Sequence, residues 1–369
     1  MDFLPRAWVQ IDLEAILKNY DAACNISNTQ IIPVIKANAY GHGATEVALA
    51  LSKRGVKLFA VSNINEAIQL READIISDIL VLGYTPISAA KLLSKHNIIQ
   101  AVFSPLFAKE LNDAAKKNNV KIRTHLKLDT GMGRIGFNCK KELEEAKEAL
   151  TLDCLENEGV FTHFSCADSN ENCDVSYTQK QYDDFCNAIK NLEAQGFSFK
   201  MKHCSNSAAI MSKKGINLDA AREGIILYGL APSKDVVLPS QFTPAMSFYA
   251  AVSMVKEVEK DEYFSYGRTF KSDSVRKIAT VSAGYGDGVP RLLSNSGYVL
   301  IKGQKANIVG RVCMDQFLID VTHIDDVKMG DIVTIFGKDL SVDEVAQKAQ
   351  TINYEIVCGI TARVPRIYK

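Results

Sequence analysis

The sequence predicts an α/β fold: a (β/α)8 TIM-type barrel followed by a mostly antiparallel β domain. From residue 31 to about residue 230, short apolar runs alternate with longer stretches of helical period. A segment with three prolines and little periodicity follows at 231–244, and beyond it apolar and polar residues alternate. We therefore expect a barrel domain at 1–235 and a β domain at 236–369. Whether residues 1–10 pack with the second domain stays open.

Eight runs in the first part have the character of buried strands. They lie at 31–37, 58–62, 78–83, 98–103, 123–129, 159–164, 199–204 and 221–225. Helical stretches lie between them, for example at 44–55, 86–96 and 178–196. This alternation favours a closed barrel. A doubly wound open sheet is the alternative, but it usually carries a glycine-rich phosphate turn after its first strand, and none follows the first run here.

The second part consists of alternating runs at 246–259, 276–288, 298–313, 316–324 and 331–337. Glycine-rich breaks separate several of them. Alternation with a period of two, interrupted by turn residues, is typical of half-buried antiparallel strands. These runs predict the β domain.

Composition limits the function classes. The chain has 43 basic and 43 acidic residues, so its net charge indicates neither a nucleic acid nor a membrane as partner. Its nine cysteines form no Cys-x-x-Cys pair, which argues against a disulfide framework or a metal site and favours a reducing cytoplasm. The N-terminal segment has no signal-peptide pattern, and no apolar run reaches the ~18 residues of a membrane span.

The active site of such a barrel forms at the carboxyl ends of its strands. Five of the eight predicted strands end on polar or charged groups, so these side chains are expected to converge on one pocket. They are Lys36, Lys127, Asp129, His163, His203 and Arg222.

Lys36 lies at the end of the first predicted strand, in the segment IIPVIKANAYGHG. A partly buried lysine amine there could bind a carbonyl compound as a Schiff base. The alternative is a lysine that extends from the rim into solvent. The small residues that follow favour close contact with a ligand.

An anion site is expected after strands seven and eight, where barrels often bind phosphate. Ser207 lies at a predicted helix start, and the backbone of Gly224 and Ile225 follows the eighth strand. Ordinary N-capping by Ser207 is the alternative. Arg222 could donate a hydrogen bond to a pyridine nitrogen and leave it unprotonated, or could instead pair with Glu223.

Ten segments together resemble the alanine racemase family, nearly end to end. They are AWVQIDLEAILKN, VIKANAYGHG, LKLDTGMGRIGF, THFSCAD, HCSNSAA, REGIILYGLAPS, SYGRTF, GYGDG, GRVCMDQ and TINYEIVC with RVPRIY. The resemblance implies interconversion of L- and D-alanine with pyridoxal 5′-phosphate, and supply of D-alanine for the peptidoglycan of the cell wall.

The resemblance implies two catalytic bases on opposite faces of the substrate Cα. Lys36 would hold the cofactor and then act on the D face, and Tyr266 would act on the L face, so inversion needs no rotation of the substrate. A phenol needs a charged or hydrogen-bonding neighbour for this task. In the family this neighbour is the histidine that matches His163, linked onward to Arg222 and His203.

The resemblance also implies a set of binding residues. Those for the cofactor are Lys36, Tyr40, Arg134, His163, Ser207, Arg222, Gly224, Ile225 and Tyr354. Arg134 and the backbone of Met314 would contact the substrate, and Tyr266 with Tyr354 would narrow the entrance in favour of alanine. Family members often carry a carbamylated lysine at the position of Lys127, where it could orient Arg134.

The family forms a head-to-tail homodimer with shared active sites. Residues of the β domain from one chain would complete the pocket of its partner. These are Tyr266, Cys313, Met314 and Asp315, with Tyr285 in a supporting role.

Other readings remain. One is a racemase of broader or serine specificity, or an amino-acid decarboxylase of the same architecture. Another is a non-catalytic pyridoxal-phosphate carrier, although such carriers lack a second domain. A third is a Schiff-base aldolase without this cofactor. One departure from the family is Glu223, where proline or an apolar residue is more usual; we expect its side chain to point away from the pocket.

Overall fold

A computed structural model of the chain describes residues 6–212 and 216–369. The chain forms two compact units. The first, here called the barrel unit, comprises Ala15–Ala39 and Ala44–Thr243. The second, the β unit, comprises the N-terminal part up to Glu14, the short segment Tyr40–Gly43, and Pro244–Lys369.

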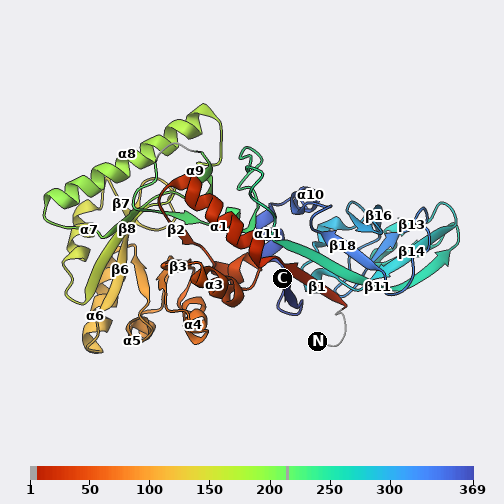
Figure 1. Cartoon of the computed structure of the whole chain (residues 1–369), viewed down its shortest axis with the longest axis horizontal. Coiled ribbons are helices and arrows are strands. Elements are labelled where there is room, and N and C mark those ends of the chain that lie inside the picture. Colours follow the sequence, from red (N-terminus) through yellow and green to blue (C-terminus); the bar gives the residue numbers. More distant parts are fainter. Residues whose placement is uncertain (1–5, 213–215) are drawn as a thin grey trace. The chain divides into compact units, whose positions relative to one another are not determined.

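The barrel unit is built on eight parallel strands (Figure 1). They are β2 (Gln30–Pro33), β3 (Leu58–Val61), β4 (Asp78–Val81), β5 (Ile99–Val102), β6 (Ile122–Asp129), β8 (Leu155–Phe161), β9 (Met201–His203) and β10 (Ala220–Glu223). Their order is β2-β10-β9-β8-β6-β5-β4-β3, and the short β7 (Phe137–Asn138) pairs with β6. A parallel bridge between Val34 and Ala60 joins the two ends of this order. The eight predicted strands and the predicted barrel are confirmed.

Helices connect the strands. They are α1 (Leu13–Ser27), α2 (Lys36–Tyr40), α3 (Ala44–Lys53), α4 (Ile64–Glu72), η1 (Ile87–Ala89), α5 (Ala90–Lys95), α6 (Pro105–Lys117), α7 (Leu143–Leu150), α8 (Asn172–Ala194), α9 (Ser207–Met211) and η2 (Ile225–Tyr228). The helices predicted at 44–55, 86–96 and 178–196 correspond to α3, η1 with α5, and α8. Because both faces of the parallel sheet are covered, β3 and β5 are buried at every residue.

Local sequence determines where these helices begin. Asn63 caps α4, because its side chain accepts hydrogen bonds from the backbone N–H groups of Asn65 and Glu66. Ser104 caps α6 in the same way, and Pro105 follows at the first helical position, where its missing N–H costs nothing.

The β unit contains an eight-stranded sheet. Its strands are β1 (Ala7–Ile11), β11 (Met246–Val258), β14 (Arg276–Val281), β15 (Tyr298–Ile301), β16 (Gln304–Val309), β17 (Phe317–Asp320), β18 (Ile332–Phe336) and β19 (Arg366–Tyr368). The order is β14-β17-β16-β15-β18-β11-β1-β19, and the pairings are antiparallel except for β1 with β19. The predicted antiparallel domain is thereby confirmed.

Shorter elements complete the β unit. They are the hairpin of β12 (Tyr263–Phe264) and β13 (Phe270–Lys271), the turns η3 (Tyr266–Arg268), η4 (Tyr285–Asp287) and η5 (Arg291–Leu293), and the helices α10 (Val342–Lys348) and α11 (Asn353–Cys358). In β11, the long strand of this unit in Figure 1, buried and half-buried residues alternate through the first eight positions. This is the period of two that the sequence shows.

Two segments distant in sequence join the β unit. The N-terminal strand β1 pairs with β11, with Val9 opposite Phe248. The segment 40–43 packs on α11: a Cβ atom at Gly41 would lie 2.1 Å from the Val357 carbonyl oxygen, and Gly41 has a φ of +83°. Only glycine fits at this close approach.

Candidate active site

Lys36 follows the residues that join the end of β2 to β3 and so close the barrel. Ile35 donates its backbone N–H to the Ala60 carbonyl at 2.9 Å, which fixes the chain one residue before the lysine. After Lys36 the chain enters a left-handed turn. The lysine thus lies at the carboxyl end of the strands, where the barrel geometry locates active-site groups.

Arg222 lies at the centre of a buried polar network. Its Nη1 is 2.6 Å from Nδ1 of His203, and its Nη2 is 3.3 Å from Nδ1 of His163. Nη2 also donates to the carbonyl oxygens of Thr162 at 2.7 Å and Cys204 at 2.9 Å, and Nη1 donates to that of His203 at 3.2 Å. Arg222 therefore bridges the ends of strands β8, β9 and β10.

The network fixes the protonation of its histidines. Burial, reinforced by the Arg222 charge, holds the pKa of both His163 and His203 well below the ordinary value. Burial also lowers the pKa of Arg222 to about 10, which still leaves it protonated at neutral pH. Because a guanidinium can only donate, both imidazoles accept through an unprotonated Nδ1.

His125 extends this network and was not identified from the sequence. Its Nδ1 is 3.1 Å from Nε2 of His203, the nitrogen that carries the proton if Arg222 donates to Nδ1. Burial lowers the pKa of His125 to about 4. Gly159 on the neighbouring strand leaves room for this ring, because a Cβ atom there would lie 2.7 Å from the imidazole.

Lys127 is a buried lysine without a carboxylate among its hydrogen-bond partners in the described part of the chain. Its Nζ donates to the Leu128 carbonyl at 2.9 Å and lies 5.4 Å from the centre of the Phe161 ring. Burial, followed by the Arg222 charge, lowers the pKa of Lys127 to about 7. At this pKa a substantial fraction of the amine is neutral and nucleophilic near neutral pH.

Ser207 links the loops that follow β9 and β10. Its hydroxyl oxygen accepts the backbone N–H of Gly224 at 2.9 Å. The alternative role of N-cap belongs to Asn206, whose side chain accepts the N–H of Ala209 at 3.0 Å. Ser207, Gly224 and Ile225 are therefore held together where a barrel can bind phosphate.

Glu223 does not pair with Arg222. The alternative ion pair is thus absent from the described residues. Its carboxyl group is fully buried, and neither oxygen has a hydrogen-bond partner in the described part of the chain. Burial, with a smaller contribution from the negative charge of Asp21 on α1, raises the pKa of Glu223 well above its ordinary value.

The loop after β6 carries Arg134 on an exposed stretch. Asp129, at the end of the strand, accepts the backbone N–H groups of Gly131 at 2.9 Å and Gly133 at 3.1 Å. Tyr177 on α8 donates its hydroxyl to the Gly131 carbonyl at 3.0 Å. These contacts fold the TGMG segment into a defined loop before the arginine.

In the β unit, two predicted segments lie side by side. Tyr285 and Gly286 donate their backbone N–H groups to the carbonyls of Cys313 and Met314, both at 2.9 Å. Asp315 accepts from Arg363 at 2.6 Å. Ser265 donates its hydroxyl to the Arg311 carbonyl at 2.7 Å, which brings the turn that contains Tyr266 to the same segment.

The exposure of these β-unit side chains is high for aromatic and apolar residues. Tyr266 is 72% exposed, Met314 52% and Tyr285 42%. Tyr354, on α11, lies with its ring centre 6.1 Å from that of Tyr40. Burial raises the pKa of Tyr40, so its hydroxyl keeps its proton.

Most of the predicted site residues thus form several small groups, some in the barrel unit and some in the β unit. The barrel unit joins His163, His203 and Arg222, and links Ser207 with Gly224. The β unit joins the segments of Tyr285, Cys313, Met314 and Asp315, and separately Tyr40 with Tyr354.

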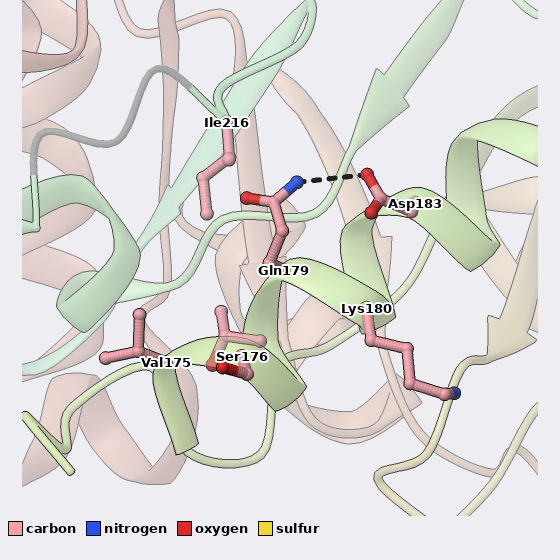
Figure 2. Close-up of a pocket in the computed structure, with 7 residues that line it drawn as sticks. Val175, Ser176, Gln179, Lys180, Asp183 and Ile216 are labelled. Carbon is pink, nitrogen blue, oxygen red and sulfur yellow. Dashed lines mark hydrogen bonds between the residues drawn. The ribbon is translucent and has the colours of Figure 1, made fainter. Parts of the chain in front are cut away.

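A hollow of about 440 Å³ lies elsewhere, on α8 beside Ile216 (Figure 2). Gln179 donates to Asp183 across the helix surface there, at 3.0 Å. None of the predicted site residues lines it. Within residues 6–212 and 216–369, no helix is long and apolar enough to cross a membrane, and no three acidic, histidine or cysteine side chains are placed to hold a metal ion.

Comparison with known proteins places the chain. Two family models match: the alanine racemase N-terminal domain over residues 11–232 and the alanine racemase C-terminal domain over 245–368. The alanine racemase of Clostridium perfringens (strain SM101 / Type A) is 46% identical over 377 residues, covering 100% of this chain and 97% of that protein. Alanine racemase 2 of Caldanaerobacter subterraneus subsp. tengcongensis is 41% identical, covering 98% and 94%.

Solved structures of alanine racemases have the same fold as this chain. The alanine racemase of Clostridium difficile 630 matches with a TM-score of 0.94 at 38% identity, covering 100% of this chain and 97% of the other. The alanine racemase from Bartonella henselae with covalently bound pyridoxal phosphate matches with a TM-score of 0.88 at 30% identity, covering 99% and 100%. The family models and these relatives therefore define an amino-acid racemase composed of a TIM-type barrel and a β domain. Within that class, the chain belongs to the alanine racemase family.

Proposed function

We propose that Lys36 and Tyr266 are the two bases with which this racemase interconverts L- and D-alanine. The observation that carries the assignment is the full-length family match combined with the position of Lys36 at the carboxyl end of β2. Lys36 would hold the cofactor through its amine and would move a proton at the D face of the substrate Cα. Tyr266 moves the proton at the L face.

The residues at the barrel mouth fit pyridoxal 5′-phosphate. The donor set supports this fit: the Ser207 hydroxyl and the Gly224 and Ile225 backbone suit a phosphate, and a buried, protonated Arg222 suits a pyridine nitrogen. When bound, the cofactor supplies an electron-withdrawing ring that acidifies the Cα proton of the attached amino acid.

Arg222 limits how strongly the cofactor withdraws electrons. It donates to imidazole nitrogens and carbonyl oxygens and keeps its own proton. Facing the pyridine nitrogen, it would leave that nitrogen unprotonated, which disfavours side reactions. We assign His163 and His203, its partners, to its orientation, and we assign Tyr40 and Tyr354 to the phosphate.

The β-unit residues are assigned to substrate access in a shared site. Arg134 and the backbone of Met314 would bind the substrate carboxylate. We infer that Tyr266, Cys313, Met314 and Asp315 complete the pocket of a second copy of the chain, with Tyr285 supporting the segment. The high exposure of Tyr266 and Met314 supports this homodimer.

A mixing experiment tests the homodimer. Lys36→Ala chains and Tyr266→Phe chains are each expected to be inactive, and subunit exchange should restore one intact site per mixed dimer. No recovered activity under verified exchange would contradict the shared site. We further propose that the enzyme works in the cytoplasm and supplies D-alanine for peptidoglycan.

Loss of optical activity tests the function directly. Purified protein with pyridoxal phosphate and L-alanine is followed by circular dichroism, with Lys36→Ala as the control. Decay to zero that is absent in the variant supports racemisation, and serine is then the next substrate to test. A bound cofactor without decay would instead favour the carrier or decarboxylase alternative.

A further inference from the structure

The turn that follows Lys36 has an unusual backbone. Ala37, Asn38, Ala39 and Tyr40 are four successive non-glycine residues with φ between 51° and 55°. L-residues enter this left-handed region singly, in turns, and rarely in succession. Such a conformation persists only when the surrounding structure holds it.

Hydrogen bonds of three kinds hold Ala37, Asn38 and Ala39, the residues of this turn that belong to the barrel unit. Ala39 donates its N–H to the Ile35 carbonyl at 2.9 Å. The side chain of Asn38 accepts the N–H of Ala44 at 2.8 Å. The third contact comes from outside the segment, from Glu66 on α4.

Glu66 uses both carboxylate oxygens. Oε1 accepts the backbone N–H of Ala37 at 2.7 Å, and Oε2 accepts that of Ser62 at 2.7 Å. Ser62 directly follows β3, so one carboxylate ties the end of β3 to the first residue after Lys36. The distances are those of charge-assisted hydrogen bonds, the stronger kind.

The position of Glu66 is itself fixed. Its own N–H donates to the side chain of Asn63, the N-cap of α4, at 3.1 Å. The carboxylate therefore projects from the first turn of a capped helix.

We propose that Glu66 is a positioning residue for Lys36: its carboxylate holds the amide that follows the lysine and so directs the lysine side chain. This inference rests on the proposed role of Lys36 in binding the cofactor. Because both of its oxygens accept backbone N–H groups, we assign Glu66 to positioning and not to proton transfer.

The test compares three variants of the full chain. Glu66→Gln keeps the shape but turns an amide N–H₂ toward one of the two donors. Glu66→Asp keeps the charge but is one methylene shorter. Glu72→Gln is the matched control, because it makes the same charge change at an exposed position of the same helix.

The first readout is made without cofactor: amide hydrogen exchange at residues 37–40, with the thermal midpoint measured in parallel. We expect Glu66→Gln to accelerate this exchange roughly tenfold or more, the factor that one charge-assisted hydrogen bond carries. Glu72→Gln should match the parent, and all thermal midpoints should stay close. Parent-like exchange at residues 37–40 in Glu66→Gln would overturn the proposal.

The second readout is cofactor uptake, followed by the visible absorbance of lysine-bound pyridoxal phosphate. We expect slower uptake and a lower kcat with little change in the KM for alanine in Glu66→Gln, and partial recovery in Glu66→Asp. The proposal would be overturned if the losses in cofactor uptake and kcat were proportional to a fall in the thermal midpoint, or if Glu72→Gln showed the same losses. Either result would make Glu66 a purely structural residue. If the parent absorbance survives Lys36→Ala, the role of Lys36 fails, whereas the amide exchange still decides whether Glu66 holds the turn.

Discussion

Lys127 and Glu223 are two buried ionisable residues with opposite consequences. The first is a base whose pKa is lowered to about 7, and the second is an acid whose pKa is raised. Burial is the main cause for both, because it penalises the charged form. Each shift leads to a distinct prediction.

Lys127 should take up carbon dioxide as a carbamate. Its neutral amine becomes the dominant form as the pH rises through about 7, and only the neutral amine can react. A carbamate would place a negative charge beside Arg222 and within reach of the Arg134 charge, both of which disfavour the ammonium form. Isotopically labelled bicarbonate should give an NMR signal that strengthens over this pH range and disappears in Lys127→Ala. An identical signal in that variant would contradict the assignment.

Glu223 should make the fold less stable as the pH rises. Below its ordinary value of 4.5 the carboxyl is protonated in both the folded and the unfolded chain. Above that value the unfolded chain releases the proton while the folded chain retains it, so the free energy of unfolding falls until the folded pKa is reached. The loss amounts to about 1.4 kcal/mol for each unit of pKa shift.

Glu223→Gln removes this loss. We expect the variant and the parent to unfold with similar free energies near pH 4.5, and the variant to be the more stable one at mildly alkaline pH. Denaturant titrations at the two pH values measure the difference. A difference that does not change with pH would show that Glu223 does not titrate in this way.

At the scale of elements, the contact between β6 and β8 depends on a missing side chain. Gly159 on β8 lies against the His125 ring of β6. A Cβ atom at residue 159 would lie only 2.7 Å from the nearest ring atoms, closer than real Cβ contacts allow. Gly159→Ala should therefore displace the imidazole from His203 and destabilise the fold by about 1–3 kcal/mol. In a His125→Ala background the same substitution should cost much less, which a double-mutant cycle measures. Equal costs in both backgrounds would rule out the steric explanation.

The elements themselves were largely predictable. Eight buried strands appear as eight apolar runs because parallel strands are covered on both faces. Polar residues inside those strands were harder to interpret. His125 occupies an interior position of β6 and has no local pattern that distinguishes it from a core residue, and Glu66 is an ordinary residue for the first turn of a helix. Their partners, His203 and Ala37, are 78 and 29 residues away in sequence.

At the scale of the whole molecule, the assignment of segments to the two units was only partly predictable. The pairing of β1 with β11 and the packing of residues 40–43 on α11 depend on contacts across most of the chain. Periodicity reports only local structure, so it does not show which sheet the N-terminal segment joins. The same limit applies to the predicted site residues. Tyr40 follows Lys36 by only four residues and yet belongs to the other unit.

The central claim is that two bases, Lys36 and Tyr266, act on opposite faces of the substrate. The most direct test is exchange of the alanine Cα proton in deuterium oxide, measured by NMR from each enantiomer. We predict that Tyr266→Phe still exchanges the Cα proton of D-alanine, by Lys36, but neither exchanges that of L-alanine nor racemises either enantiomer. Lys36→Ala should do none of these. If Tyr266→Phe exchanged the protons of both enantiomers equally, or still racemised alanine, the two-base assignment would be wrong.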